Sequence, residues 1–204
     1  MKRINNILPT DKTAETAAHS RWNSIAKPLG SLGLLETAIE KIAAVQHTEN
    51  VDISKRTVVV ICADNGVVSE NISQSDSSVT AVCTNAIANG TSNINVLAHT
   101  FKAEVIAVDM GVDFDFENPK ILDRKIAYGT KNIAVGAAMT TAQAELAIST
   151  GMDIVSDLKK SGTKIIVTGE MGIGFVIISS SAMERQGKLI PFQSEAWLSS
   201  RLCR

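Results

Sequence analysis

The chain has 204 residues, of which 45% are hydrophobic, so it is long enough for one large domain or two small ones with a packed core. Its 20 Lys and Arg residues nearly balance 21 Asp and Glu residues, which gives no electrostatic argument for a nucleic-acid or acidic-membrane partner. Aromatic residues make up 4% of the chain, which also argues against stacking on nucleotide bases.

Apolar runs and cysteines indicate a cytoplasmic protein without a membrane partner. The longest apolar run, residues 58–63, is far shorter than the roughly 20 residues of a membrane helix. The N-terminus carries positive charge but lacks an apolar segment of secretory length. Cys62, Cys83 and Cys203 are odd in number and widely spaced, which favours reduced thiols over a disulfide scaffold.

The first fifty residues are predicted to form a helical segment. Residues 11–27 are rich in helix formers, and Pro28 then ends the helix. Gly30 and Gly33 favour a turn. Residues 34–47 carry apolar side chains at helical spacing on one face, namely Leu35, Ile39, Ile42 and Val45.

The remainder alternates strands with helices. Residues 56–66, 102–113 and 163–172 each begin as a buried, β-branched strand. Residues 79–101 and 140–162 are predicted to be helical, although Gly90 and several Asn residues weaken the middle of the first. This alternation predicts a parallel, Rossmann-like α/β sheet flanked by helices.

Each predicted strand ends in a carboxylate and a glycine. The three ends are Asp-Asn-Gly at 64–66, Asp-Met-Gly-Val-Asp at 109–113 and Gly-Glu-Met-Gly at 169–172. One such end alone is more often ordinary turn chemistry. Because ligands bind beyond the carboxyl ends of parallel strands, three ends together favour a shared cleft.

Residues 169–174, GEMGIG, do not have the spacing of the dinucleotide-binding fingerprint. Their backbone N–H groups suit a phosphate if a helix begins just after them. His19, His47 and His99 have no ligand spacing, so we expect no metal site and no cofactor. Cys62, inside a strand, is expected to be a core residue and not a nucleophile.

Six segments carry a family resemblance. In chain order they are RWNSIAKPLGSLGLLE (21–36), VVVICADNGVVSENISQS (58–75), VTAVCTNAIANGTSNINVLA (79–98), VIAVDMGVD (105–113), GTKNIAVGAAMT (129–140) and GEMGIG (169–174). Together they resemble the nicotinate-nucleotide:dimethylbenzimidazole phosphoribosyltransferase (CobT) family over about residues 21–174. The resemblance implies that the phosphoribosyl group of nicotinate mononucleotide moves to 5,6-dimethylbenzimidazole. The products are nicotinate and α-ribazole 5′-phosphate, a precursor of the nucleotide loop of cobalamin.

The resemblance also implies seven substrate-binding positions, which are Asp64, Asn65, Gly66, Ser75, Cys83, Glu170 and Gly172. Glu170 and Gly172 match a ligand-contacting loop, with Gly172 approaching phosphate or ribose. Ser75 lines the pocket for the aromatic base, and Cys83 stands where the family often has a polar residue that contacts the base. Residues 64–66 match the strand end beside that pocket. Family members are generally homodimers, so a homodimer is expected.

Departures from the family pattern accumulate toward the C-terminus. Asp76 and Ala137 replace prolines that the family usually has, and Phe175 begins a tail unlike the family. The family continues with further strands and a glutamate proposed as general base, so the C-terminal part of the fold and the catalytic base are expected to lie beyond this chain. The expected organisation is a helical segment at 1–50, a partial α/β domain at 51–174 and a divergent, out-of-frame or aberrant tail at 175–204.

Three functional hypotheses remain open. The first is a phosphoribosyltransferase impaired by truncation. The second is a non-catalytic remnant that binds a nucleotide or base, and the third is a different Rossmann-like, nucleotide-dependent transferase. A sheet cut midway exposes a strand edge and apolar surface, so low stability or poor solubility is expected for the chain alone.

Overall fold

The structure is a computed structural model that describes residues 8–174. The predicted tail at 175–204 lies outside the described residues. The chain divides into two compact units, Met1–Lys55 and Arg56–Arg204, each with its own packing.

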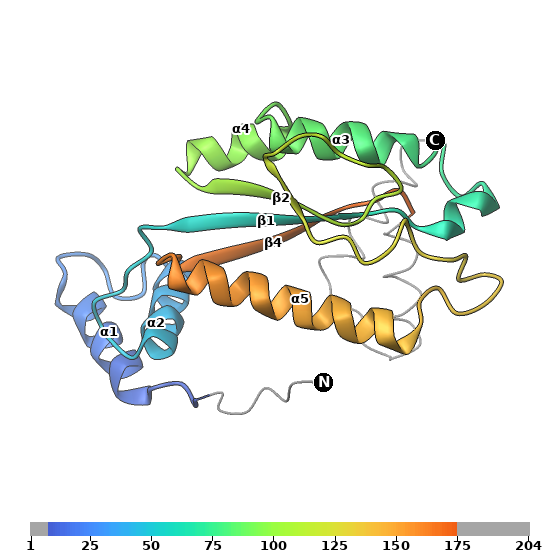
Figure 1. Cartoon of the computed structure of the whole chain (residues 1–204). Helices are drawn as coiled ribbons and strands as arrows, with labels where there is room; N and C mark the ends of the chain where they lie inside the picture. The colour runs from blue at the N-terminus through green and yellow to red at the C-terminus, as the bar shows by residue number, and fades with distance from the viewer. Residues whose placement is uncertain (1–7, 175–204) are drawn as a thin grey trace. The chain divides into compact units, whose positions relative to one another are not determined.

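The N-terminal unit contains two helices joined by a turn, α1 (Lys12–Ser24) and α2 (Leu34–Gln46) (Figure 1). Asp11 caps α1, since its Oδ1 accepts hydrogen bonds from the backbone N–H groups of residues 13 and 14. The helices contact through small residues, which let two helix backbones approach closely. The buried alanines are Ala14, Ala18, Ala43 and Ala44.

The predicted apolar face of α2 is wrong in part. Leu35 and Val45 are 54% and 66% exposed, whereas Glu36 is buried. Glu36 occupies this place because Lys27 Nζ lies 2.7 Å from its Oε1, and the pair closes the turn between the helices. The hydrogen bond from Lys27 holds the pKa of Glu36 below its ordinary value. Gly30 and Gly33 have positive φ, as the predicted turn requires.

The second unit is built on a four-stranded sheet. Its strands are β1 (Arg56–Ala63), β2 (Glu104–Gly111), β3 (Ile121–Asp123) and β4 (Ile165–Met171). Their order is β3-β2-β1-β4, and every pairing is parallel. The parallel α/β architecture predicted from the sequence is therefore confirmed. β3, with three residues, was too short to be predicted.

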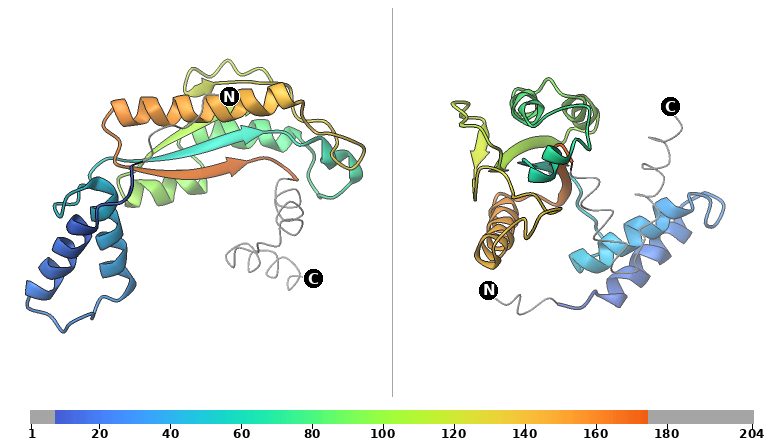
Figure 2. Two further views of the ribbon diagram at one scale, coloured as in Figure 1. Left: turned by 90° about the horizontal axis from the view of Figure 1, so that it is seen from below. Right: turned by 90° about the vertical axis from the view of Figure 1, so that its right-hand side faces the viewer.

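Helices cover both faces of this sheet, as Figure 2 shows. The helices α3 (Ser78–Ala88) and α4 (Asn93–Thr100) pack on one side, called the α3 face, where Val58, Val60 and Cys62 of β1 contact them. The helix α5 (Thr141–Lys160) packs on the other side, the α5 face. A short 3-10 helix, Gly66–Glu70, follows β1.

The helix predicted over residues 79–101 is two helices. Gly90 has φ +81°, a conformation that ends a right-handed helix and that glycine adopts without strain. α4 then begins at a capping box between Ser92 and Asn95. Among the described residues, no helix combines the length and apolar character needed to span a membrane.

Candidate functional site

The three predicted strand ends lie at one edge of the sheet. Ala63 of β1 pairs with Gly111 of β2, and Cys62 of β1 pairs with Met171 of β4. A bulge between Cys62 and Ala63 shifts the register there. Since all strands are parallel, the segments after β1, β2 and β4 emerge side by side, as a shared cleft requires.

Asp64 ties the ends of β1 and β2 together. It is 5% exposed, and its backbone N–H donates to the carbonyl of Gly111 at 2.9 Å. Its Oδ2 accepts from the backbone N–H of Asp113 at 2.8 Å. Its backbone carbonyl accepts from the N–H of Thr130 at 3.0 Å. The other carboxylate oxygen, Oδ1, is buried and has no hydrogen-bond partner among the described residues.

Asn65 is held by a hydrogen bond and Gly66 by close packing against backbone. The side-chain amide of Asn65 donates to the carbonyl of Ile173 at 3.1 Å, which joins the ends of β1 and β4. A Cβ on Gly66 would lie 2.5 Å from the carbonyl oxygen of Thr130, so only glycine fits against this backbone. Both residues therefore have structural roles, and substrate contact by either stays a prediction.

Gly172 is also a close-contact glycine. A Cβ at this position would overlap the carbonyl oxygen of Ala63 and lie 3.0 Å from Nδ2 of Asn65. The structure thus gives Gly172 a role that the sequence did not predict, because it lets the end of β4 pass against the end of β1. The predicted approach of Gly172 to phosphate or ribose stays a prediction.

Glu170 lies at the carboxyl end of β4, paired with Ile61. Paired residues of parallel strands point to the same side, so the Glu170 side chain is on the α5 face with Ile61. The side chain is solvent-accessible, yet partial burial of its carboxyl raises the pKa of Glu170 to about 7. A carboxyl group that titrates near neutrality at a strand end is a candidate for substrate contact or proton exchange.

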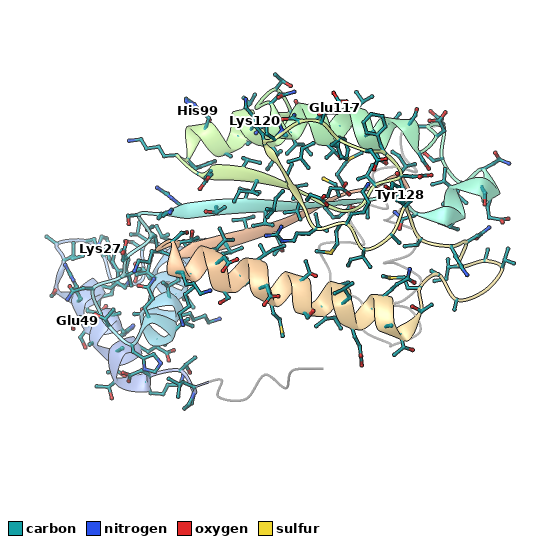
Figure 3. The ribbon with its side chains drawn as sticks, viewed as in Figure 1. Lys27, Glu49, His99, Glu117, Lys120 and Tyr128 are labelled. Carbon is teal, nitrogen blue, oxygen red and sulfur yellow. The ribbon has the colours of Figure 1, made fainter. Side chains whose placement is uncertain are left out.

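An ion pair with Lys125, a residue that the sequence did not single out, holds the end of β2 in place. Asp109 is 2% exposed, and its carboxylate lies 3.0 Å from Lys125 Nζ. Lys125 also donates to the carbonyls of Val112 and Phe114 at 2.6 and 2.7 Å. Its ammonium lies 4.4 Å from the centre of the Tyr128 ring, a residue labelled in Figure 3. The charge of Lys125 thereby balances that of Asp109.

Ser75 and Cys83 are half-buried. Ser75 lies in the loop before α3, where its backbone N–H donates to the Ser73 hydroxyl at 3.2 Å. Neither residue lines the two cavities described next, so their predicted contact with the base stays untested. Cys62 is fully buried, and burial raises its thiol pKa to about 11, so its predicted place in the core is confirmed.

Each face of the sheet has a cavity near its carboxyl edge. The α5-face cavity, of about 190 Å³, lies between Ile61 and Met110 of the sheet and Ala138 and Met139 of the GAAMT motif, so its lining is mainly apolar. The α3-face cavity, of about 380 Å³, is more polar. Its lining residues are Asp64, Ser77, Ser78, Ala81, Val82, Asn85, Asp113 and Phe114.

Comparison with known families gives one extended match. A phosphoribosyltransferase family model matches residues 7–189. The match runs past Gly174, where the resemblance by motifs ends, and covers both described units.

Similar proteins carry the name nicotinate-nucleotide--dimethylbenzimidazole phosphoribosyltransferase. The one from Ruminiclostridium cellulolyticum is 39% identical over 178 residues, which are 87% of this chain and 51% of that protein. The one from Acetivibrio thermocellus is 42% identical over 161 residues, 79% of this chain and 46% of that protein. A crystal structure of the Thermus thermophilus enzyme of this name aligns with a TM-score of 0.77 and 32% identity over 81% of this chain and 51% of that chain. The chain thus spans about half the length of the relatives it matches.

Proposed function

The chain belongs to the phosphoribosyltransferase family that matches residues 7–189, and we propose that it takes part in transferring the phosphoribosyl group of nicotinate mononucleotide to 5,6-dimethylbenzimidazole. The observation that carries the proposal is the meeting of three strand ends at one edge of a parallel sheet, with Glu170 at that edge. The names of the similar proteins support the choice of substrates. We propose a cytoplasmic homodimer, as the cysteines and the family resemblance predict.

In this reaction the bonds that form and break lie between the two substrates, without a covalent bond to the protein. A ring nitrogen of the base attacks the anomeric carbon of the ribose, the glycosidic bond to nicotinate breaks, and the bonding electrons neutralise the pyridinium nitrogen. The imidazole proton of the base must then leave to a general base. We propose that residues 8–174 contribute substrate binding and orientation to this reaction.

Glu170 is the residue of this chain that we assign to substrate contact. It stands at a strand end, it is accessible, and its pKa of about 7 lets it accept or donate a hydrogen bond near neutral pH. Gly172 and Asn65 hold the ends of β4 and β1 against each other, which fixes the position of Glu170. Ser75 and Cys83 remain our candidates for the base pocket.

A turnover assay tests the proposal. The full chain, with its mass verified, is incubated with both substrates, and α-ribazole 5′-phosphate is measured by chromatography. Binding of nicotinate mononucleotide is measured in parallel by calorimetry. Glu170→Gln is expected to weaken this binding about tenfold or more, because a charge-assisted hydrogen bond is lost. Glu104→Gln changes an exposed glutamate at the opposite end of the sheet and should have no effect.

One alternative that the sequence leaves open is a non-catalytic module that binds nucleotide or base. Binding without product formation, still sensitive to Glu170→Gln, would select this alternative. If neither binding nor turnover is detected with folded protein, both functions are wrong for this chain.

A further inference from the structure

Lys125 does more than balance the charge of Asp109. Its side chain is 15% exposed, and an ammonium group has three N–H donors. The Asp109 carboxylate lies 3.0 Å from Nζ, and the backbone carbonyls of Val112 and Phe114 accept hydrogen bonds at 2.6 and 2.7 Å. The Tyr128 ring, centred 4.4 Å from Nζ, adds a cation–π contact. All the donors of this lysine are therefore engaged within the chain, so its role lies in what it holds in place.

The two carbonyls belong to the segment that follows β2, residues 112–116, here called the β2 loop. The Asp109 carboxylate fixes the start of this loop, since its Oδ1 accepts from the backbone N–H groups of Gly111 and Val112 at 3.1 and 2.9 Å. The lysine fixes the loop further along. Val112 is fully buried, and a buried carbonyl that loses its donor is costly. Removal of the ammonium should therefore release the β2 loop.

The β2 loop contributes two residues to the carboxyl edge of the sheet. The backbone N–H of Asp113 donates to Asp64 Oδ2 at 2.8 Å. Asp113 and Phe114 also line the α3-face cavity. Lys125 binds the carbonyls of the two residues that flank Asp113. By fixing both neighbours, the lysine sets the position of the Asp113 N–H and, through it, of the Asp64 carboxylate.

The segment that carries Lys125 is itself tied to the end of β2. The backbone N–H groups of Ile126 and Gly129 donate to the carbonyls of Met110 and Gly111, each at 3.0 Å. Ile126 and Gly129 also line the α5-face cavity. Lys125 thus connects this anchored segment to the β2 loop, and it lies between the walls of the two cavities.

We propose that Lys125 is a positioning residue, whose ammonium holds the β2 loop so that Asp113 and Asp64 keep the arrangement that binds substrate. Lys125 acts through the loop and does not touch the substrate. The inference rests on the proposed function for its ligand, nicotinate mononucleotide, whereas the fixing of the loop can be measured without any ligand.

The variants separate the lysine from the charge of its partner. Lys125→Met alone would leave the Asp109 carboxylate buried without a cation, which is strongly destabilising. The double variant, Asp109→Asn with Lys125→Met, removes both charges, and Asp109→Asn alone keeps the lysine. Lys120→Met, at an exposed lysine just before β3 that Figure 3 labels, is the matched control. Each variant is the full 204-residue chain, with folding checked by circular dichroism.

Two measurements follow. Amide hydrogen exchange at Asp113 should be about tenfold faster or more in the double variant than in Asp109→Asn, while exchange at Val59 in β1 should be equal in the two. A general loss of stability would accelerate exchange at both amides. The Kd for nicotinate mononucleotide, measured by calorimetry on folded protein, should rise about tenfold in the double variant and stay unchanged in Lys120→Met.

The outcomes decide the proposal. Exchange at Asp113 that is equally slow in the double variant and in Asp109→Asn overturns it, because the β2 loop would then hold without the lysine. Faster exchange at Asp113 with unchanged affinity also overturns it, since the loop would not position the substrate. If the unsubstituted chain binds no nicotinate mononucleotide, the proposed function fails separately, and exchange at Asp113 alone decides whether Lys125 holds the loop.

Discussion

β1 and β4 have similar compositions but differ in how deeply the structure buries them. Both are rich in valine and isoleucine, and both were predicted to be buried. In β1, Val58, Val59 and Val60 are each about 5% exposed, whereas Val167 of β4 is 47% exposed. β1 has strands on both edges and helices on both faces, while β4 has a single strand neighbour among the described residues. Composition therefore predicts a strand, but its place in the sheet determines its burial.

The largest expected effect concerns two glycines of the β4 region. Gly172→Ala should lower the free energy of unfolding by about 2 to 4 kcal/mol, because the added Cβ overlaps the carbonyl oxygen of Ala63. Gly169→Ala is the matched control, since its Cβ would make an ordinary 3.5 Å contact with Val60. Urea unfolding of both variants gives the comparison. Equal stabilities would mean that β4 does not press on the end of β1.

The next effect compares one substitution in the two strands. Val60→Ala should cost about 2 kcal/mol, because it removes buried methyl groups from a packed core. Val167→Ala should cost less than about 0.5 kcal/mol, as for an exposed side chain. Denaturant midpoints of the two variants measure the difference. A cost at Val167 as large as that at Val60 would show that another surface covers β4 in solution.

The smallest effect is the pH dependence contributed by Glu170. Its pKa is raised from 4.5 to about 7 by burial, so folding opposes its ionisation. The contribution of Glu170 to the free energy of unfolding is fully present below the unfolded pKa of 4.5, and it is lost as the pH rises through about 7. Glu170→Gln should remove that loss and, because the side chain is accessible, raise Tm at pH 8 by only about 1 to 3 °C. Thermal melts of both proteins across this window test it, and a constant difference between them at all pH values would contradict it.

Much of the fold was predictable because local chemistry and hydrophobic pattern agree. The run 58–63 predicts a strand apolar on both faces, and the structure places it at the centre of the sheet. Gly90 indicated the break between α3 and α4, but the apolar spacing by itself predicted one continuous helix. The face of α2 was mispredicted because Lys27 stabilises a buried glutamate from a separate loop, and such a pairing has no local signal.

The candidate site was predictable in position and not in detail. Strand ends with carboxylate and glycine predicted the edge where Asp64 and Glu170 lie. Their different environments depend on neighbours distant in sequence, such as Asp113 at Asp64 and Ile61 beside Glu170. Lys125 was missed because a lone lysine in a loop resembles any surface lysine until the fold places it on Asp109.

By itself, the sequence determined the positions of the longer helices and strands, the parallel architecture and the family, because apolar spacing, glycines and ordered motifs are local properties of the chain. Only the tertiary structure decided which strand is central, which glycines are needed for backbone contact, and which carboxylates are paired. Those properties depend on the atoms that long-range contacts bring together, and these set the burial, the space and the charge around each residue.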